Sequence, residues 1–483
     1  MRSISGQQLA RDLGNWPETG GTGPTYSRLA AAIRLLVLDG RLPLETRLPS
    51  ERELSTALRV SRTTVTTAYD ELRGAGYAAS RQGSGTWTTV PTAGPAGATT
   101  AAWAPFGPDR SHGEGRLDLA HAAPEAPTGI LHEAYAVALK QLPRHLPTSG
   151  YDLFGLPELR SAIAERFRAR GLATTPEQVL VTAGTQHAFA LVLSVLTDPG
   201  DRVLIDHPTY PNAIDAIRRA ATRPVPVPLR NDGWDVDALA AAVRQSAPRL
   251  AYLIPDFQNP TGLLAGVQER ASMAAELARS RTVTVIDETH VDLALDVSAP
   301  PPFAGHLPPD AAVTIGGVSK SVWGGMRIGW IRADEAIVRR LAAARASFDM
   351  SSPVVEQLAA AEVLRRHDEF VAHTCDELRR RRDTLAGAVA EHLPQWSFRL
   401  PAGGLVLWCD IGVPASSRLV SAAEQYGIRL AAGPRFGVDG AFERRLRLPY
   451  VHPADVLQQA VPTIAAAFHA ATAATGPQVD VVA

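Results

Sequence analysis

Apolar side chains recur at helical spacing in the first ninety residues of the chain. One helix is predicted around residues 29–37 and ends at Gly40. A second helix begins at Ser50, which has the capping-box spacing with Glu53, and stops near residue 60. A third begins at the N-cap Ser61 and ends near residues 74–76, with an apolar face at Val65, Ala68, Tyr69 and Leu72. Two short capped helices joined by a tight turn predict a helix-turn-helix, and the residues behind it predict a β-hairpin.

The hydrophobic pattern changes in the rest of the chain. From residue 117 to about residue 472, short apolar runs alternate with longer amphipathic stretches, which is typical of an α/β fold with a mainly parallel sheet. A segment rich in Pro, Gly, Ala and Thr without periodicity separates the two parts and predicts a linker. The predicted organisation is an N-terminal domain at 1–90, a linker at 91–116, a large domain at 117–475 and a tail at 476–483.

Composition excludes several classes of protein. A hydrophobic content of 45%, a charged content of 20% and a net charge of −1 are those of a globular chain, neither disordered nor polycationic. Two cysteines do not form a disulfide framework, so we expect a reducing, cytoplasmic location. No apolar stretch reaches about 18 residues, so we expect no membrane span. The chain holds 48 basic residues, of which only Lys140 and Lys320 are lysines.

Five strand-like runs in the large domain end in chemically reactive or polar residues. The segments that follow these runs are residues 183–186 (AGTQ), 206–211 (DHPTYP), 259–262 (NPTG), 287–288 (DE) and 319–320 (SK). Because the carboxyl ends of parallel strands meet at one edge, we expect these segments to form one ligand site. Taken singly, each has an ordinary structural interpretation, since NPTG is a plausible turn and Asp287 a plausible N-cap.

Together and in this order, the five segments resemble the fold-type-I aminotransferases, class I/II, over roughly residues 117–470. The resemblance implies pyridoxal 5′-phosphate (PLP) as cofactor, with Lys320 forming the imine and Asp287 beneath the pyridine nitrogen. It also implies that Asn259 donates to ring O3′ and that Tyr210 stacks on the ring. The remaining implied cofactor-binding residues are Tyr151 (reaching the neighbouring subunit's phosphate), Gly184, Thr185, Gln186, His290, Ser319 and Arg327. Arg447 matches the arginine that pairs with a substrate or effector α-carboxylate.

Two positions depart from the pattern of these enzymes. His290 stands where a tyrosine usually donates to O3′, and Gly317 stands where a serine or threonine often binds the phosphate. His290 has two interpretations, as a donor to O3′ or as a packed core residue. We expect PLP to bind despite both departures, with the tuning of the imine and the speed of transamination in question.

Residues 26–87 resemble the winged helix-turn-helix domain of GntR-family bacterial regulators. The matching stretches are LPSEREL, VSRTTV, AYDEL, GY and GSGT. The resemblance implies contacts to double-stranded operator DNA from Arg47, Ser50, Arg52, Ser61, Arg62, Thr63 and Thr64, with Gly83 and Gly85 at the wing tip. The alternative is a small helical domain with solvated arginines.

A GntR-type domain followed by an aminotransferase-like domain resembles the MocR subfamily of transcriptional regulators. That resemblance implies a domain-swapped, head-to-tail homodimer that senses PLP, or a small amino compound as its aldimine, and holds no metal. The alternatives are a working aminotransferase with a DNA-binding head, and a regulator that has lost PLP.

Overall fold

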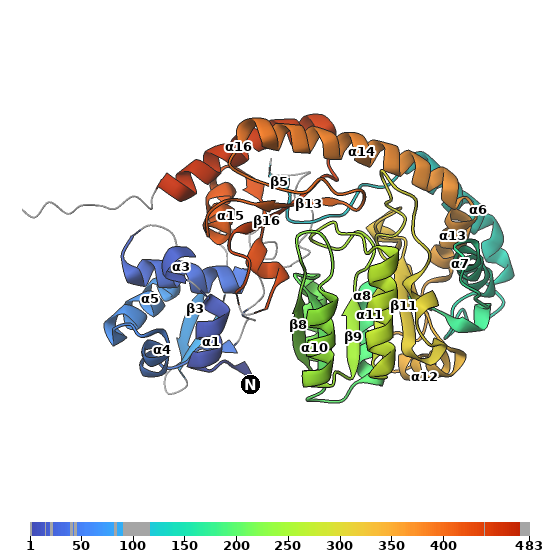
Figure 1. The fold of residues 1–483 in the computed structure, drawn as a ribbon, viewed down its shortest axis with the longest axis horizontal. Coiled ribbons are helices and arrows are strands. Elements are labelled where there is room, and N and C mark those ends of the chain that lie inside the picture. Colours follow the sequence, from blue (N-terminus) through green and yellow to red (C-terminus); the bar gives the residue numbers. More distant parts are fainter. Residues whose placement is uncertain are drawn as a thin grey trace, which may run out of the picture.

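The computed structural model describes residues 2–14, 16–19, 23–38, 42, 46–81, 85–89, 116–438 and 440–473. These residues form an N-terminal domain, a large sheet with helices on both faces, and a smaller C-terminal subdomain (Figure 1). Most of the predicted linker, the predicted tail and Gly83 lie outside the described residues, so the domain boundaries stay predictions. No helix in the described residues is long and apolar enough to cross a membrane.

The N-terminal domain contains the predicted helix-turn-helix and hairpin. Ser50 Oγ accepts from the backbone N of Glu53 at 3.2 Å, and Ser61 Oγ accepts from the backbone N of Thr64 at 3.0 Å, so both N-caps form. The Glu53 carboxylate closes no capping box on Ser50, because it accepts from the backbone N of Gly6 at 2.6 Å. The helices are α1 (Gly6–Leu13), α2 (Trp16–Thr19), α3 (Thr25–Leu38), α4 (Glu51–Leu58) and α5 (Arg62–Gly74).

The strands of this domain form one small sheet. Their order is β1 (Arg2–Ser3), β2 (Thr46–Arg47), β4 (Gly85–Thr88) and β3 (Ala78–Arg81). β3 and β4 are the predicted antiparallel hairpin. α1 and β1 were not predicted, because α1 is short and its apolar residues become informative only when they pack beside Leu29 and Leu54.

A seven-stranded sheet forms the centre of the large domain. Its order is β6 (Val179–Thr182), β12 (Gly329–Arg332), β11 (Ala312–Gly317), β10 (Val283–Asp287), β9 (Leu250–Leu253), β7 (Arg202–His207) and β8 (Arg223–Pro228). β12 runs antiparallel to both neighbours, and the other pairs are parallel. The five predicted runs are β6, β7, β9, β10 and β11, so their carboxyl ends do meet at one edge.

Side chains alternate between the two faces of this sheet. Tyr252 and Val285 pack under α8 (Thr185–Leu196) and α12 (Glu335–Arg345), whereas Leu253 and Ile286 pack under α10 (Val236–Ser246) and α11 (Val267–Arg279). Burial on both faces explains why the strands are continuous apolar runs. The other helices of this part are α6 (Thr128–Gln141), α7 (Pro157–Ala169), α9 (Pro211–Arg219) and α13 (Val354–Arg365).

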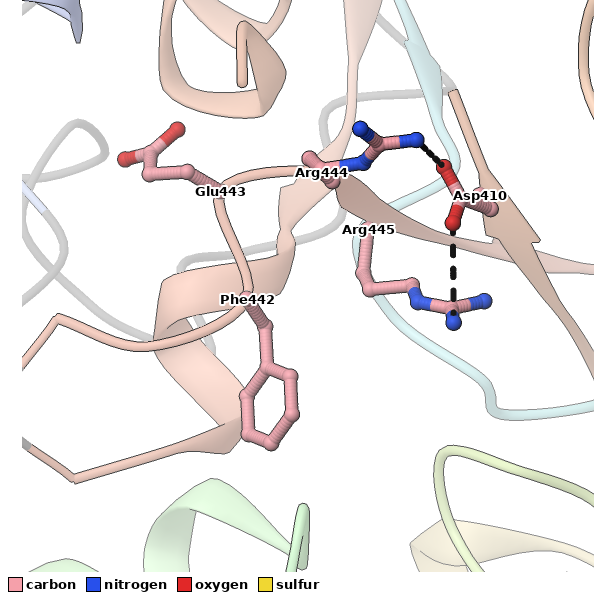
Figure 2. Close-up of a pocket in the computed structure, with 5 residues that line it drawn as sticks. All are labelled: Asp410, Phe442, Glu443, Arg444 and Arg445. Atoms are coloured by element: carbon pink, nitrogen blue, oxygen red, sulfur yellow. Dashed lines mark hydrogen bonds and ion pairs between the residues drawn. The ribbon is translucent and has the colours of Figure 1, made fainter. Parts of the chain in front are cut away.

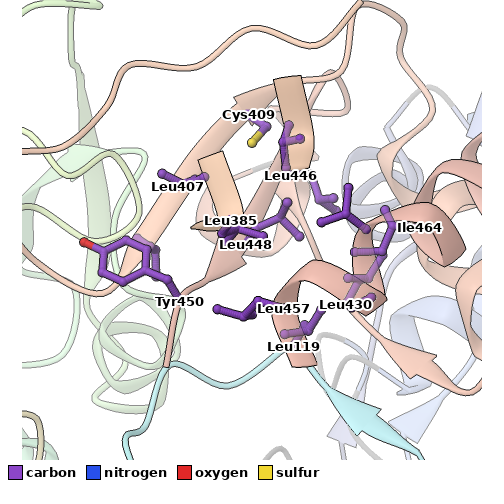
Figure 3. Packing of buried hydrophobic residues seen from close by; sticks show 14 of the residues in the cluster. Leu119, Leu385, Leu407, Cys409, Leu430, Leu446, Leu448, Tyr450, Leu457 and Ile464 are labelled. Atoms are coloured by element: carbon purple, nitrogen blue, oxygen red, sulfur yellow. The ribbon is translucent and has the colours of Figure 1, made fainter. Parts of the chain in front are cut away.

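The smaller subdomain packs three helices on a short antiparallel sheet. Its strands are β13 (Val406–Asp410), β16 (Arg445–Pro449) and β15 (Ala431–Ala432), while β14 (Ile428–Arg429) pairs in parallel with β5 (Leu117–Asp118). The helices are α14 (His367–His392), α15 (Ser416–Gln425) and α16 (Ala454–Ala473). Leucines of both sheet and helices fill the core together with Cys409, which is a buried free thiol (Figure 3).

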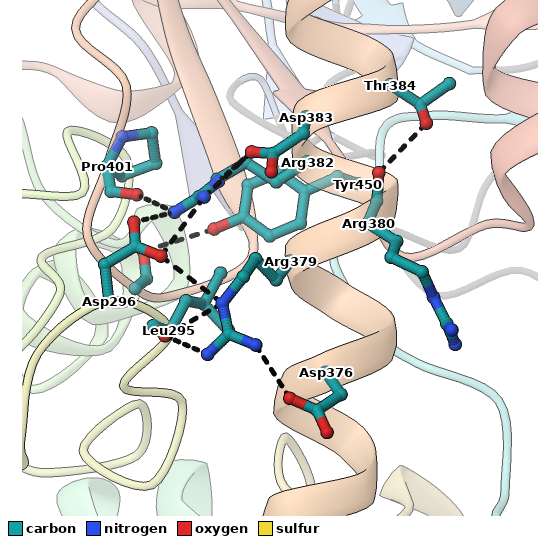
Figure 4. Close-up of polar contacts among 11 residues, drawn as sticks. Leu295, Asp296, Asp376, Arg379, Arg380, Arg382, Asp383, Thr384, Pro401 and Tyr450 are labelled. Atoms are coloured by element: carbon teal, nitrogen blue, oxygen red, sulfur yellow. Dashed lines mark hydrogen bonds and ion pairs between the residues drawn. The ribbon is translucent and has the colours of Figure 1, made fainter.

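Polar contacts connect α14 to the loop that follows β10. The buried Arg382 forms an ion pair with Asp296 and donates to the backbone O of Pro401 at 2.8 Å (Figure 4). Tyr450 Oη donates to the backbone O of Gly403 at 3.1 Å. These contacts fix the small subdomain relative to the strand that ends in Asp287.

Candidate cofactor site and nucleic-acid interface

Lys320 follows β11 and lies partly buried at the sheet edge. Its Nζ donates to the backbone O of Ala122 at 2.6 Å. Loss of hydration, reinforced by the charge of Arg447 and opposed by Asp287, lowers the pKa of Lys320 to about 8. By contrast, Lys140 is exposed on α6. The amine of Lys320 is therefore placed and tuned to lose its proton near neutral pH.

Asp287 ends β10 as a buried carboxylate with its own hydrogen-bond partners. Tyr252 Oη donates to Oδ2 at 2.6 Å, while the backbone N of Thr289 donates to Oδ1 at 2.9 Å and the Thr289 hydroxyl donates to the same oxygen. Burial raises the pKa of Asp287, and the hydrogen bonds from Thr289 and Tyr252 oppose that rise. Sequence reasoning missed Tyr252 and Thr289. The only signal for Tyr252 was a hydroxyl inside an otherwise apolar strand.

Gly184, Thr185 and Arg327 form a cradle at the N-terminus of α8. Gly184 has φ +93°, and a Cβ there would lie 2.9 Å from Arg327 Nη2, so only glycine fits. Arg327 Nη2 donates to the backbone O of Ala183 at 2.7 Å. Thr185 Oγ1 lies 3.3 Å from Thr289 Oγ1. Backbone N–H groups, a hydroxyl and a guanidinium at a helix N-terminus suit a phosphate.

Two predicted residues beside the cradle have structural partners. Gln186 Nε2 donates to the backbone O of Asn212, and Asn212 Nδ2 donates to Tyr210 Oη at 2.8 Å. Burial raises the pKa of Tyr210, with a smaller contribution from Asp287. Ser319 is partly buried beside Lys320.

The structure explains why residue 317 is glycine. A Cβ at Gly317 would lie 3.0 Å from the backbone O of Ile328 and 3.1 Å from Thr185 Oγ1. The Thr185 hydroxyl thus stands where a residue-317 side chain would point. With glycine instead of the usual Ser or Thr at residue 317, the Thr185 hydroxyl is the hydroxyl that fills this part of the cradle.

His290 is buried in the site and neutral at physiological pH. Burial, together with the charges of Lys320 and Arg447, lowers its pKa to about 3. Its Nδ1 has no hydrogen-bond partner among the described residues. An orphaned buried polar atom next to Lys320 is consistent with a ligand group at that position.

Arg447 on β16 joins the small subdomain to the site. Nη1 donates to Asn259 Oδ1 at 3.2 Å, Nη2 donates to the backbone O of Ala120, and the guanidinium lies 4.8 Å from the ring centroid of Phe436. Burial first, and then the charge of Arg435, lowers the pKa of Arg447 to about 9. A buried cation whose Nε has no partner in the described part of the chain suits a carboxylate ligand.

The backbone of residues 120–122, here called the strap, contacts both of these cations. Ala122 O accepts from Lys320, and Ala120 O accepts from Arg447. The strap follows β5, which follows the predicted linker. Sequence reasoning missed the strap because it acts through carbonyl oxygens, which every residue carries and no side chain type indicates.

These residues fit PLP. A buried carboxylate, a deprotonatable amine, a phosphate cradle and an orphaned imidazole nitrogen all lie at or just after the carboxyl ends of β6, β10 and β11. Tyr151 does not belong to this set within one chain, since its side chain is 66% exposed before α7. Its implied role requires a second copy.

The N-terminal domain presents its predicted contacts outward. Arg62 and Thr63 are exposed in the first turn of α5, and Arg62 lies 3.8 Å from Glu51 of α4. Arg47 is exposed on β2, and its Nε lies 3.0 Å from the position of a Cβ at Gly85. The other described members of the predicted set are Ser50, Arg52, Ser61 and Thr64, all at the N-termini of α4 and α5.

The chain combines two kinds of domain. One has a sheet edge that carries this amine, carboxylate and cradle, and the other is a winged helix-turn-helix. Residues 125–464 match the family "Aminotransferase class I and II", and residues 25–87 match "Bacterial regulatory proteins, gntR family". The chain therefore belongs to the class I and II aminotransferase family, which is PLP-dependent, and carries a GntR-type domain at its N-terminal side. The expected fold class is confirmed.

Relatives include both regulators and enzymes. The HTH-type transcriptional regulator YisV of Bacillus subtilis (strain 168) is 24% identical over 91% of this chain and 94% of its own. The probable rhizopine catabolism regulatory protein MocR of Rhizobium meliloti is 30% identical over 64% of this chain and 65% of its own. The 2-aminoadipate transaminase of Thermus thermophilus is 30% identical over 68% of this chain and 81% of its own. The solved structure of LysN, an α-aminoadipate aminotransferase from Thermus thermophilus, superposes with a TM-score of 0.69 at 27% identity, covering 74% of this chain and 94% of that chain.

Proposed function

We propose that this protein is a PLP-binding transcriptional regulator of the MocR type, which binds operator DNA through its N-terminal domain. The observation that carries the proposal is the presence of both residue sets in one chain, with His290 and Gly317 as the two departures. The GntR-type domain implies DNA binding, and the aminotransferase fold is commonly dimeric. We include the domain-swapped homodimer, with Tyr151 acting on the partner's site, in the proposal.

Each residue has a defined task when PLP binds. PLP supplies a carbonyl carbon that links covalently to amines and a ring that withdraws electrons. Lys320 provides the neutral amine, and Asp287 holds a proton on the pyridine nitrogen. Gly184, Thr185 and Arg327 bind the phosphate, while Arg447 orients the carboxylate of an amino compound.

The strap connects this chemistry to the DNA-binding domain. A ligand that engages Lys320 and Arg447 competes with the carbonyl oxygens of Ala122 and Ala120 for the same donors. Because the strap and β5 continue directly from the linker, release of the strap changes the constraint on the N-terminal domain. This provides a route from effector binding to operator affinity.

Borohydride trapping tests the cofactor. The full-length protein is incubated with PLP, reduced, and analysed by peptide mass spectrometry. We expect one adduct on Lys320, none in Lys320→Ala, and none on the exposed Lys140. An adduct elsewhere, or no adduct, overturns the cofactor assignment.

An operator-binding titration tests the interface. Arg62→Ala should weaken binding at least tenfold, since a charged base contact contributes about 1–3 kcal/mol. Arg34→Ala, which removes an exposed cation from α3, serves as the matched control and should leave affinity nearly unchanged. Unchanged binding by Arg62→Ala would contradict the assignment of α5 as the recognition helix.

An active aminotransferase with a DNA-binding head is the second candidate. The buried Arg447 beside Lys320 favours it, because the pair could hold an amino acid by its carboxylate and amine. A half-reaction assay separates the two. Rapid conversion of the bound cofactor to its pyridoxamine form by a common amino acid would favour the enzyme.

A further inference from the structure

Arg435 is a partly buried arginine without a hydrogen bond or ion pair to any described residue. Two other arginines a few residues along the same segment differ from it. Arg444 lies 3.4 Å from Asp410 and Arg445 lies 3.6 Å from the same carboxylate, so both charges are already paired (Figure 2). The Arg435 side chain, left unpaired by the described residues, is therefore available to pair with an anion from outside this part of the chain.

The backbone around Arg435 is fixed beside the cofactor site. Arg435 lies in the 3-10 turn Gly433–Phe436, and the backbone N of Thr209 donates to Phe436 O at 2.9 Å. The backbone N of Val438 donates to His207 Nε2 at 3.1 Å. The turn is thereby attached to the loop that carries Tyr210, while the ring of Phe436 supports the guanidinium of Arg447.

The charge of Arg435 acts on the interior of the site. After burial, it is the largest influence that lowers the pKa of Arg447. It also acts on Tyr210, whose pKa is raised by burial and lowered in part by Arg447 and Arg435. The guanidinium therefore lies within electrostatic reach of both the carboxylate-binding arginine and the predicted ring-stacking tyrosine.

We infer that Arg435 binds a second carboxylate, so that the effector is an amino acid with an acidic side chain. The inference rests on the proposed function, in which the amine of the effector would react at the cofactor carbonyl carbon in place of Lys320, and Arg447 would bind the α-carboxylate. With the cofactor phosphate assigned to Arg327 and the α-carboxylate to Arg447, Arg435 is left for another anion. A dicarboxylic amino acid relieves the repulsion between the two guanidinium groups and pairs both.

The test uses the full-length, PLP-loaded protein and a panel of defined amino acids. L-aspartate, L-glutamate and L-2-aminoadipate are compared with L-asparagine, L-glutamine and L-norleucine by the absorbance change of the bound cofactor. We expect at least one dicarboxylic amino acid to bind at least tenfold tighter than its uncharged counterpart. Arg435→Gln should abolish that preference while changing affinity for the uncharged amino acids less than threefold.

Arg444→Gln is the matched control, because it removes a cation from the same segment that is exposed and paired with Asp410. It should retain the full preference, and Arg435→Lys should retain part of it. If the unmodified protein binds dicarboxylic and uncharged amino acids equally well, the inference is overturned. It is also overturned if Arg435→Gln weakens binding of both classes of amino acid equally, because both arginines would then share one α-carboxylate. Failure to trap PLP on Lys320 instead overturns the proposed function, so the two failures are distinguishable.

Discussion

At the scale of single residues, the two lysines among 48 basic residues have opposite environments. Lys140 is exposed on α6, where an arginine would serve equally well. Lys320 lies at the carboxyl end of the sheet, where only an amine that can lose its proton can form a covalent link to an aldehyde. The scarcity of lysine therefore left two candidates for the reactive residue, and burial explains why the pKa of Lys320 is lowered.

The pH dependence of covalent attachment checks this environment. Because the folded protein lowers the pKa of Lys320 to about 8, the neutral, reactive amine is scarce at pH 6 and predominates above pH 9. The rate of borohydride-trapped PLP attachment should rise with pH through a midpoint near 8 and then level off. A midpoint near the ordinary lysine value would contradict the assigned environment.

Gly317→Ser should weaken cofactor binding even though it restores a hydroxyl common in related enzymes. The new Cβ meets the backbone O of Ile328 at 3.0 Å and Thr185 Oγ1 at 3.1 Å, and such overpacking costs about 1–3 kcal/mol. We expect a several-fold loss of PLP affinity in a fluorescence titration. Gly129→Ser, where a Cβ meets nothing within 4 Å, is the control and should bind PLP normally. If Gly317→Ser binds PLP more tightly than the unmodified protein, the prediction is contradicted, because Ile328 and Thr185 would then have to shift to accommodate the new side chain.

At the scale of elements, local signals were sufficient where the chain interacts with itself over a few residues. The N-caps Ser50 and Ser61 place α4 and α5, because each hydroxyl accepts from the backbone three residues ahead. Glu53 does not complete the predicted capping box, because its carboxylate accepts a hydrogen bond from the backbone N of Gly6, 47 residues away. Sequence spacing could not anticipate that contact.

The α14 helix offers a prediction at this scale. Arg382 is buried between Asp296 and Pro401, whereas Arg380 points away from them (Figure 4). Arg380 pairs instead with its helix neighbour Glu377. Arg382→Ala should lower the free energy of unfolding by about 1–3 kcal/mol, because it leaves Pro401 O unpartnered and removes packing. Arg380→Ala should change it by less than about 0.5 kcal/mol. Urea denaturation of the full-length protein followed by fluorescence measures both.

At the scale of the whole molecule, the N-terminal domain touches the segment that carries Arg435 and Arg447. Within one chain, a Cβ at Gly14, which caps α1, would lie 3.5 Å from Gly440 Cα, and α2 contacts α15 of the small subdomain. Gly440 stands between Arg435 and Arg447 in the sequence. The segment that carries the two arginines is therefore also the segment that meets the N-terminal domain.

A paired-cysteine experiment identifies which copy makes this contact. Gly14→Cys with Gly440→Cys places two Cβ atoms close enough for a disulfide, although both positions have positive φ, where a side chain costs about 1–3 kcal/mol each. Cys375 and Cys409 are buried and should not compete. On non-reducing gels, a band at monomer mobility supports contact within one chain, and a crosslinked dimer supports the domain swap. Absence of any disulfide would contradict the contact itself.

The sequence by itself determined the class of fold and the strands whose ends carry the candidate site, because these follow from local periodicity. Its resemblance to known enzymes singled out Lys320, Asp287 and Arg447 as candidates, and their roles stay predictions. Only the tertiary structure decided that Tyr252 and Thr289 hold Asp287, that the strap satisfies Lys320 and Arg447, and that Arg435 is left unpaired among the described residues. Each of these depends on segments far apart in the chain meeting at one edge of the sheet, and such contacts are set by packing rather than by neighbouring residues.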